Sequence, residues 1–268
     1  PIVMDQPAPT SDIKTHIALA EVPLSAPGKP HRDLLLIGYG SGTTAGVLAN
    51  SGKVSQVTIA ELEPAIFACS HFFAPITGDP IAKSHLPGSN ILAVLNDGRY
   101  VLASRTTAYD AIVCQPSDPW VNGSSDLFTE EFFRLVKRRL STDGTFCQWV
   151  QLYSIDPARF GVLCRTFISV FSHGLLYHDK DAGECLLLAP PESANPEDLV
   201  KELRGRRATV VDSAGIKQMC RRLALQTAEA RLNTDDNLIV EFAAAAGAVT
   251  QESEGISENI QWIERYAK

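Results

Sequence analysis

The sequence predicts an α/β fold: a doubly wound, mostly parallel, seven-stranded Rossmann-like sheet. Two observations predict it. Short apolar runs alternate with helix-like segments, which is typical of a parallel sheet whose strands are joined by helices. The runs are apolar throughout, as buried parallel strands are. Four of them end in glycine or polar residues, and ligands of such sheets bind beyond the carboxyl ends of the strands.

Residues 1–33 are rich in proline and polar side chains, so we expect an N-terminal arm or linker without a long helix. Residues 34–190 form the predicted Rossmann-like domain. Its expected strands are 34–37, 57–60, 91–95, 111–114, 145–150, 175–178 and 185–189. Its expected helices are 43–50, 64–73 and 129–140.

The helix expected over 129–140 has clear end signals. Thr129 can cap its first turn, acidic residues follow at the positive end, and basic residues close the negative end. The Asp143–Gly144 pair after it predicts a turn. Residues 191–242 are expected to form a more polar helical appendage, and 243–268 an alanine-rich, then acidic tail.

Composition argues against several classes of function. The chain has 268 residues and a formal net charge of -7, which disfavours binding to nucleic acid. Its six cysteines form no CxxC pair and its histidines lack metal-like spacing. We therefore expect reduced, buried thiols, a cytosol-like reducing compartment and no metal site. No apolar run approaches the roughly 18 residues that cross a bilayer.

A glycine loop, Gly38-Tyr39-Gly40-Ser41-Gly42, follows the first expected strand. Glycines let backbone N–H groups approach a ligand because a Cβ would block the contact. The GxGxG spacing, rather than GxGxxG, favours an adenosyl sulfonium over a dinucleotide. The loop also has no basic residue that would pair with a phosphate. Taken alone, it is equally consistent with a tight turn.

Carboxylates follow the next two strands. Glu61, 21 residues after Gly40, can accept both hydroxyls of a ribose. Asp97 can accept from the exocyclic amino group of adenine. Each has a simpler interpretation, Glu61 as a solvated carboxylate and Asp97–Gly98 as a turn. The joint pattern at successive strand ends is what predicts a nucleotide site.

These segments resemble the spermidine synthase (polyamine aminopropyltransferase) family. The motifs that carry the resemblance are LIGYGSG (36–42), VTIAELEP (57–64), NDGR (96–99) and YDAIV (109–113). Others are similar to the soluble domains of membrane-fused relatives: PSDPW (116–120), LFTEEFF (127–133), QWVQLY (148–153) and LNTDD (232–236) with Glu241-Phe242. The resemblance covers roughly residues 14–242 and implies a sheet of the S-adenosylmethionine-dependent methyltransferase type.

The resemblance also implies a cosubstrate, decarboxylated S-adenosylmethionine or S-adenosylmethionine, with Glu61 on the ribose and Asp97 on the adenine. The family's reaction is attack by a polyamine nitrogen on the carbon next to sulfur, with release of methylthioadenosine. It needs a neutral amine, aligned atoms and an acidic side chain as base or cation anchor. The implied cosubstrate-binding residues are Gly38, Gly40, Ser41, Gly42, Glu61, Asp97 and Gly98.

The sequence departs from the family pattern at the reacting centre. Gln115 stands where spermidine synthases have a carboxylate, and an amide cannot accept a proton from an ammonium. Ser41 stands where they have an aspartate facing the aminopropyl amine, and the N-terminal β-domain is reduced to residues 1–33. Asp118 is the remaining expected base or cation anchor, with a turn-stabilising aspartate before Pro119 as the alternative.

Aromatic residues near these motifs are candidate substrate contacts. Trp120, Tyr153 and Tyr177 could contact a cationic substrate through their ring faces, or could simply pack in the core or a lid.

Three functions stay open. The leading prediction is transfer of an aminopropyl group to a small-molecule amine. The alternatives are an S-adenosylmethionine-dependent methyltransferase, because Ser41 would not repel a cosubstrate carboxylate, and a catalytically degenerate relative kept as a structural or assembly subunit. The partners left open are a second copy in a homodimer and a larger assembly. Membrane association would require a segment outside this chain.

Overall fold

An eight-stranded sheet forms the centre of the protein, in the order β3-β2-β1-β4-β5-β7-β6-β8. The computed structural model describes residues 10–25, 31–119, 121, 123–180, 183–206, 208–227, 231–241 and 252–267. The strands are β1 (His31–Ile37), β2 (Val54–Glu61), β3 (Ile91–Leu95), β4 (Tyr109–Cys114), β5 (Leu140–Gln151), β6 (Leu175–Asp179), β7 (Glu184–Ala189) and β8 (Ala208–Val211). The helices are α1 (Thr10–Ser25), α2 (Thr43–Asn50), α3 (Pro64–Ala68), α4 (Ala74–Thr77), α5 (Pro80–Ser84), α6 (Gly98–Ser104), α7 (Glu130–Arg139), α8 (Pro157–Val170), α9 (Pro196–Arg204), α10 (Ser213–Thr227) and α12 (Glu252–Tyr266), with 3-10 turns η1 (Ser70–Phe73) and η2 (Ser125–Phe128).

Strands β1 to β5 form the parallel half of the sheet. β1 pairs with β2 and β4, β2 with β3, and β4 with β5, all in parallel. Helical segments make every crossing between them, as parallel pairing requires. The remaining pairs, β5 with β7, β7 with β6 and β6 with β8, are antiparallel. The predicted doubly wound, mostly parallel sheet is therefore confirmed, and the carboxyl ends of five strands meet at one edge.

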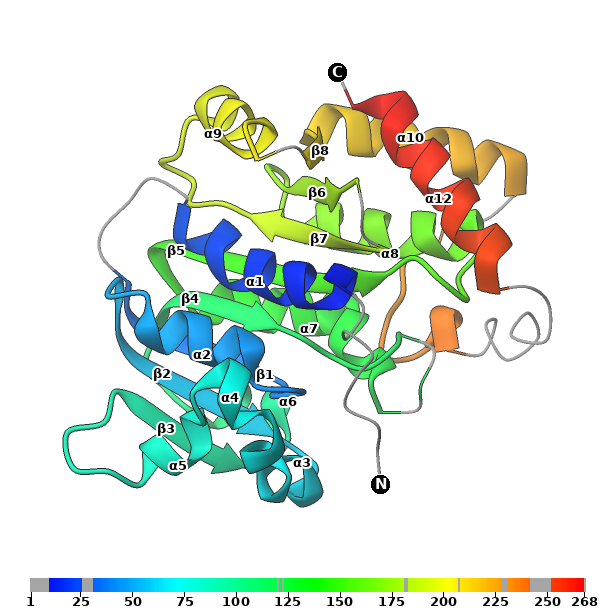
Figure 1. Ribbon diagram of the computed structural model, residues 1–268. Helices are drawn as coiled ribbons and strands as arrows, with labels where there is room; N and C mark the ends of the chain where they lie inside the picture. The colour runs from blue at the N-terminus through cyan, green and yellow to red at the C-terminus, as the bar shows by residue number, and fades with distance from the viewer. Residues whose placement is uncertain are drawn as a thin grey trace.

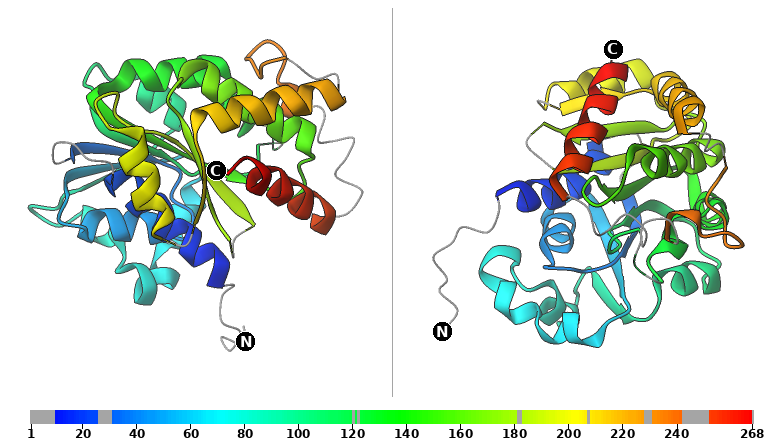
Figure 2. Two further views of the ribbon diagram at one scale, coloured as in Figure 1. Left: turned by 90° about the horizontal axis from the view of Figure 1, so that it is seen from above. Right: turned by 90° about the vertical axis from the view of Figure 1, so that its right-hand side faces the viewer.

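Helices cover both faces of the sheet, as Figure 1 and the turned views of Figure 2 show. α1, α2 and α9 pack over one apolar cluster, to which β1 contributes Leu34 and Leu36. α6, α7, α8, α10 and α12 pack over the other, to which β1 contributes Leu35 and Ile37. Successive side chains of a strand point to opposite faces, so one short apolar strand serves both clusters.

The N-terminal segment corrects one sequence prediction. The expectation of an arm without a long helix was wrong, because α1 is a 16-residue helix. Pro23 lies near its C-terminal end, where a missing hydrogen bond disrupts little of the helix. Leu19, Ala20 and Val22 are fully buried, and this packing on the sheet stabilises α1 more than local propensity would.

Smaller differences concern the ends of the elements. β8, four residues that are all buried, adds an eighth strand in a segment that was expected to be helical. The sequence did not predict this strand because so short an apolar run shows no strand periodicity. The helix expected over 64–73 is α3 followed by the turn η1. Asp143–Gly144 lies inside β5, beside a shift of register against β4, and is not a turn between elements. The expected tail contains α12.

The cysteines and the helices bear on the compartment prediction. All six cysteines are free; five are buried as expected, whereas Cys69 is exposed. Burial raises the pKa of thiols such as Cys114 and Cys147, which makes them poor nucleophiles. No helix in the described part of the chain is long and apolar enough to span a membrane.

Candidate functional site

A cavity of about 610 Å³ lies at the carboxyl edge of the parallel half of the sheet. Its volume falls in the range of small-molecule sites, roughly 300–1,000 Å³. Loops far apart in the sequence meet here because parallel strands end at the same edge. Of the predicted site residues, those that line the cavity are Gly38, Gly40, Glu61, Asp97, Gly98, Gln115, Asp118 and Tyr153.

The glycine loop lets the end of β4 approach the end of β1. Gly38 has φ +86, and a Cβ there would lie 2.2 Å from the Gln115 carbonyl oxygen. Gly40 has φ +55, and its Cβ would lie 2.8 Å from Gln115 Nε2. The close approach of Gln115 therefore leaves no room for a side chain at either position, which is a reason for glycine that the sequence alone did not show.

The half-buried carboxylate of Glu61 is held by backbone donors. Its Oε2 accepts from the Tyr39 N–H at 2.8 Å and its Oε1 from the Glu63 N–H at 2.9 Å. Each carboxylate oxygen can accept more than one hydrogen bond. Glu61 is therefore oriented in advance and keeps acceptor capacity toward the cavity that it lines.

Asp97 lies both at the start of α6 and at the cavity. It caps α6, since its Oδ1 accepts from the Tyr100 N–H at 2.6 Å, and it also lines the cavity. Gly98 allows α6 to begin directly against β1, because a Cβ there would lie 2.3 Å from the Ile37 side chain.

Gln115 is buried, with 7% of its surface exposed, and has one firm partner. Its Oε1 accepts from the Thr44 hydroxyl at 2.7 Å, so the amide is tied to the first turn of α2. Thr44 Oγ1 also lies 3.2 Å from the His16 carbonyl oxygen of α1. Gln115 thus joins the end of β4 to the two helices above it.

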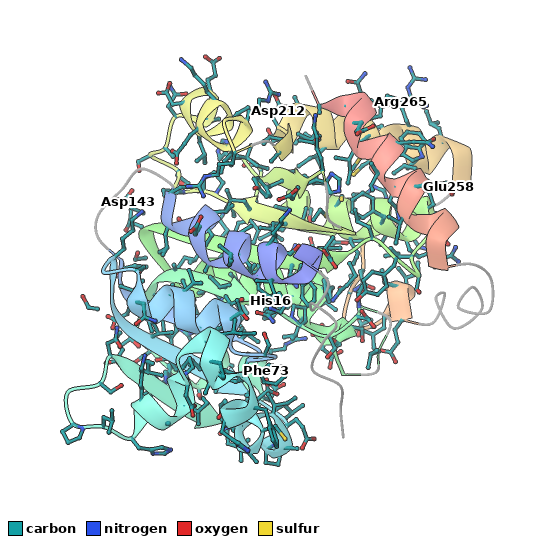
Figure 3. All side chains as sticks on the ribbon, in the orientation of Figure 1. His16, Phe73, Asp143, Asp212, Glu258 and Arg265 are labelled. Carbon is teal, nitrogen blue, oxygen red and sulfur yellow. The ribbon has the colours of Figure 1, made fainter. Side chains whose placement is uncertain are left out.

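Ser41 and Gly42 are outside the cavity lining. Ser41 Oγ lies 3.0 Å from Thr43 Oγ1 and 3.4 Å from His16 Nδ1. Figure 3 labels His16 on the side of α1 that faces α2. In the part of the chain that the structure describes, the Ser41 hydroxyl therefore faces a second hydroxyl and an imidazole.

Asp118 and Tyr153 form a pair on the opposite side of the cavity. The Tyr153 hydroxyl donates to Asp118 Oδ1 at 3.1 Å, and both side chains are half-buried. Burial raises the pKa of Asp118, and the hydrogen bond from Tyr153 offsets part of that rise.

Gln151 and Trp149 are among the lining residues that the sequence reasoning missed. Gln151 is 1% exposed and Trp149 Nε1 is buried; among the described residues, neither Gln151 Oε1 nor Trp149 Nε1 has a hydrogen-bond partner. Unpaired buried polar atoms are rare and call for a partner. Gln151 is the last residue of β5, so the strand-end rule that found Glu61 could have found it.

The remaining predicted substrate contacts lie elsewhere. Tyr177 belongs to β6 and is 4% exposed within the apolar cluster under α1 and α9, so its assignment as a substrate contact is wrong. Burial raises the pKa of its hydroxyl. An aromatic ring is suited to contact a cation, but β7 separates the strand of Tyr177 from β5 and the cavity. Trp120 lies outside the described residues.

The cavity lining is acidic. Its carboxylates are Glu61, Glu63, Asp97 and Asp118, and the described lining residues include no lysine, arginine or histidine. A cavity lined by charges of one sign attracts ligands of the opposite charge, so carboxylates here attract cations and repel anions. The site is therefore suited to positively charged ligands.

A family model for the spermine/spermidine synthase domain matches residues 13–173. The chain belongs to this family. A polyamine aminopropyltransferase of Moorella thermoacetica is 30% identical over 131 residues, 49% of this chain and 44% of that protein. Putrescine N-methyltransferase 2 of Nicotiana attenuata is 26% identical over 153 residues, 55% of this chain and 38% of that protein. The chain spans less than half the length of these curated relatives.

The fold comparison agrees with the family. Spermidine synthase from Thermotoga maritima superposes with a TM-score of 0.56 and 21% identity, over 71% of this chain and 63% of that one. At this identity the likeness shows the Rossmann-like fold alone. Members of the family and its relatives include aminopropyltransferases and methyltransferases, so the family is one of transferases.

Proposed function

We propose that the protein is a transferase that binds decarboxylated S-adenosylmethionine or S-adenosylmethionine in this cavity and transfers an aminopropyl group to a small amine. The charge of the cavity carries the proposal, because its described lining has four carboxylates and no basic side chain. A sulfonium and an ammonium are both cations, so these walls suit both reactants. The name of the Moorella thermoacetica relative, polyamine aminopropyltransferase, supports the reaction class.

The residues present fit such a cosubstrate. We assign the ribose hydroxyls to Glu61, whose oxygens are already held by backbone donors. We assign the adenine amino group to Asp97, whose second oxygen is not used in capping α6. Gly38 and Gly40 leave the loop backbone open beside the remaining part of the ligand.

Asp118 is the proposed base and cation anchor. The sulfonium supplies an activated carbon: the amine nitrogen forms a bond to it, the carbon–sulfur bond breaks, and a thioether leaves. The proton lost by the nitrogen goes to a carboxylate, and burial raises the pKa of Asp118 in the direction that favours proton uptake. Gln115 cannot take a proton; fixed by Thr44, it positions the reactants.

A second candidate, methyl transfer from intact S-adenosylmethionine, is favoured by one observation. Ser41 and Gln115 are both uncharged, so neither side chain would repel the carboxylate of the intact cosubstrate. A relative is named putrescine N-methyltransferase, which supports an amine as acceptor here too.

Product analysis tests both candidates. The purified protein is incubated with putrescine and each sulfonium, and the products are identified by mass spectrometry. Methylthioadenosine supports aminopropyl transfer, and S-adenosylhomocysteine supports methyl transfer. Calorimetry then measures binding of each sulfonium. Binding without either product identifies the catalytically degenerate alternative, and absence of binding refutes the proposal.

A matched pair of variants checks the assigned site. In Glu61→Gln, one of the two backbone N–H donors faces an amide NH₂, and the charged acceptor is lost. Hydrogen bonds to a charged acceptor contribute about 1.5–3 kcal/mol each. The affinity for the sulfonium should therefore fall at least tenfold. Glu258→Gln changes an exposed carboxylate on α12 and should leave affinity unchanged. Equal affinity in both variants would remove Glu61 from the site.

A further inference from the structure

The segment that carries Tyr153 is short and constrained. β5 ends at Gln151 and α8 begins at Pro157, and Tyr153 lies between them. Ser154, the next residue, has φ +52. Non-glycine residues adopt this left-handed region mainly where their surroundings hold them there. The turn that presents Tyr153 to Asp118 therefore depends on contacts from elsewhere in the fold.

Asn259 of α12 makes such contacts. Its Nδ2 donates to the Leu152 carbonyl oxygen at 3.0 Å and to the Ile155 carbonyl oxygen at 2.8 Å. The side chain is fully buried. These two carbonyls flank Tyr153 and Ser154, so a single amide group fixes both ends of the turn. Buried carbonyls rarely lack a donor, so the pair of bonds selects this backbone path.

α12 itself is anchored one turn further on. Ile263, four residues after Asn259, lies on the same helix face and is fully buried in the core. Figure 2 shows α12 beside α10, with which it is in contact. The position of Asn259 is thus set by packing at residues that lie beyond the 13–173 match to the family model.

We propose that Asn259 is a positioning residue of the active site. Through the carbonyls of Leu152 and Ile155 it fixes Tyr153, whose hydroxyl holds the Asp118 carboxylate in the cavity. The inference rests on the proposed function for the role that Asp118 plays in transfer. The C-terminal helix thereby supports, from outside the cavity, a site whose described lining residues all lie between 37 and 153, within the match to the family model.

The test measures the pKa of Asp118 by carbon-13 NMR of the aspartate carboxyls, in the protein without substrate. Tyr153→Phe removes a hydrogen bond to the charged form, so the pKa of Asp118 should rise. Asn259→Ala should also raise the pKa of Asp118. The double variant, Tyr153→Phe with Asn259→Ala, should raise it no further than Tyr153→Phe alone. The other cavity carboxylates, Glu61, Glu63 and Asp97, are unchanged in these variants.

Two controls separate positioning from loss of structure. Glu258→Ala, on the exposed side of α12, should leave the pKa unchanged. Ile263→Ala loosens the packing that positions Asn259 but keeps the amide donors, so it should raise the pKa by clearly less than Asn259→Ala does. If Asn259→Ala does not fold, Asn259→Ser keeps one donor and should give a smaller rise.

The inference is overturned if Tyr153→Phe raises the pKa of Asp118 while the Asn259 variants do not, or if Tyr153→Phe has no effect. An equal rise in Ile263→Ala would also overturn it, because general loosening would then suffice. These measurements need no substrate. Their outcome can therefore be distinguished from a failure of the proposed transfer reaction. In an active protein, Asn259→Ala should lower kcat about 10- to 100-fold and leave the KM for the sulfonium nearly unchanged.

Discussion

Replacing Gly38 by alanine should destabilise the protein far more than the same change at Gly52. Both glycines have positive φ, +86 and +67. A Cβ on Gly52 would have no neighbour within 4 Å, whereas one on Gly38 would lie 2.2 Å from the Gln115 carbonyl oxygen. The pair shares the backbone requirement and differs in the close approach of β4. The difference between the stability losses of the two variants therefore measures the effect of the steric clash with Gln115.

The magnitudes follow from the geometry. Alanine in the left-handed region costs about 1–2 kcal/mol, and a stiffer unfolded chain returns about 0.4–1 kcal/mol. Gly52→Ala should therefore lower the free energy of unfolding by about 1 kcal/mol. At Gly38 the ends of β1 and β4 must also separate, which strains the 2.8 Å bond from Gln115 N–H to the Ile37 carbonyl. Overpacking adds about 1–3 kcal/mol and the bond about 1 kcal/mol, so about 3–5 kcal/mol in all is expected.

Urea denaturation followed by circular dichroism measures both variants against the parent. The slope of free energy with urea should stay constant while the midpoint falls more for Gly38→Ala. If the two variants lose equal stability, Gln115 does not approach the glycine loop as described. That result would also withdraw the argument that this glycine serves the fold as well as the ligand.

Three further outcomes are expected. In an active protein, Tyr153→Phe should move the acid limb of the kcat/KM profile to higher pH, since the pKa of Asp118 rises; an unmoved limb would exclude Asp118 as the base. Burial raises the folded pKa of Asp118 above its unfolded value, so its contribution to stability is complete below the unfolded pKa and is lost as pH rises through the folded one. As the pH rises from the unfolded to the folded pKa of Asp118, the parent should therefore lose stability relative to Asp118→Asn. Thermal unfolding of both proteins at a series of pH values measures this loss. Gln151→Met removes a side-chain carbonyl that has no partner among the described residues, together with a long 3.5 Å bond from Nε2 to the Pro116 carbonyl oxygen, so it should change the free energy of unfolding by less than about 1 kcal/mol; a larger loss on thermal unfolding would contradict this reading of Gln151.

The cavity could be predicted where its residues follow strands directly. Glu61 and Asp97 come immediately after apolar runs, and parallel strands bring their carboxyl ends to one edge. The order of the strands in the sheet is not needed to see that these groups gather. The same local rule applies to Gln151, the last residue of β5, which lines the cavity as well.

Other residues could not be placed without the tertiary structure. Tyr177 looks like a substrate contact in sequence, but its position depends on β7 inserting between β5 and β6. α1 forms despite its proline because its apolar side chains pack against the sheet. Ser41 belongs to the glycine loop, yet it turns toward His16 and Thr43 and away from the cavity.

The sequence by itself determined the sheet type, the glycine loop and the carboxylates at the strand ends, because apolar runs and their polar ends are local features of the chain. The tertiary structure alone decided which groups meet across it: Gln115 with Thr44, Tyr153 with Asp118, and Asn259 with the turn that carries Tyr153. These partners are 71, 35 and 107 residues apart in the chain. Contacts over such separations are set by packing of the whole core, and no local pattern encodes them.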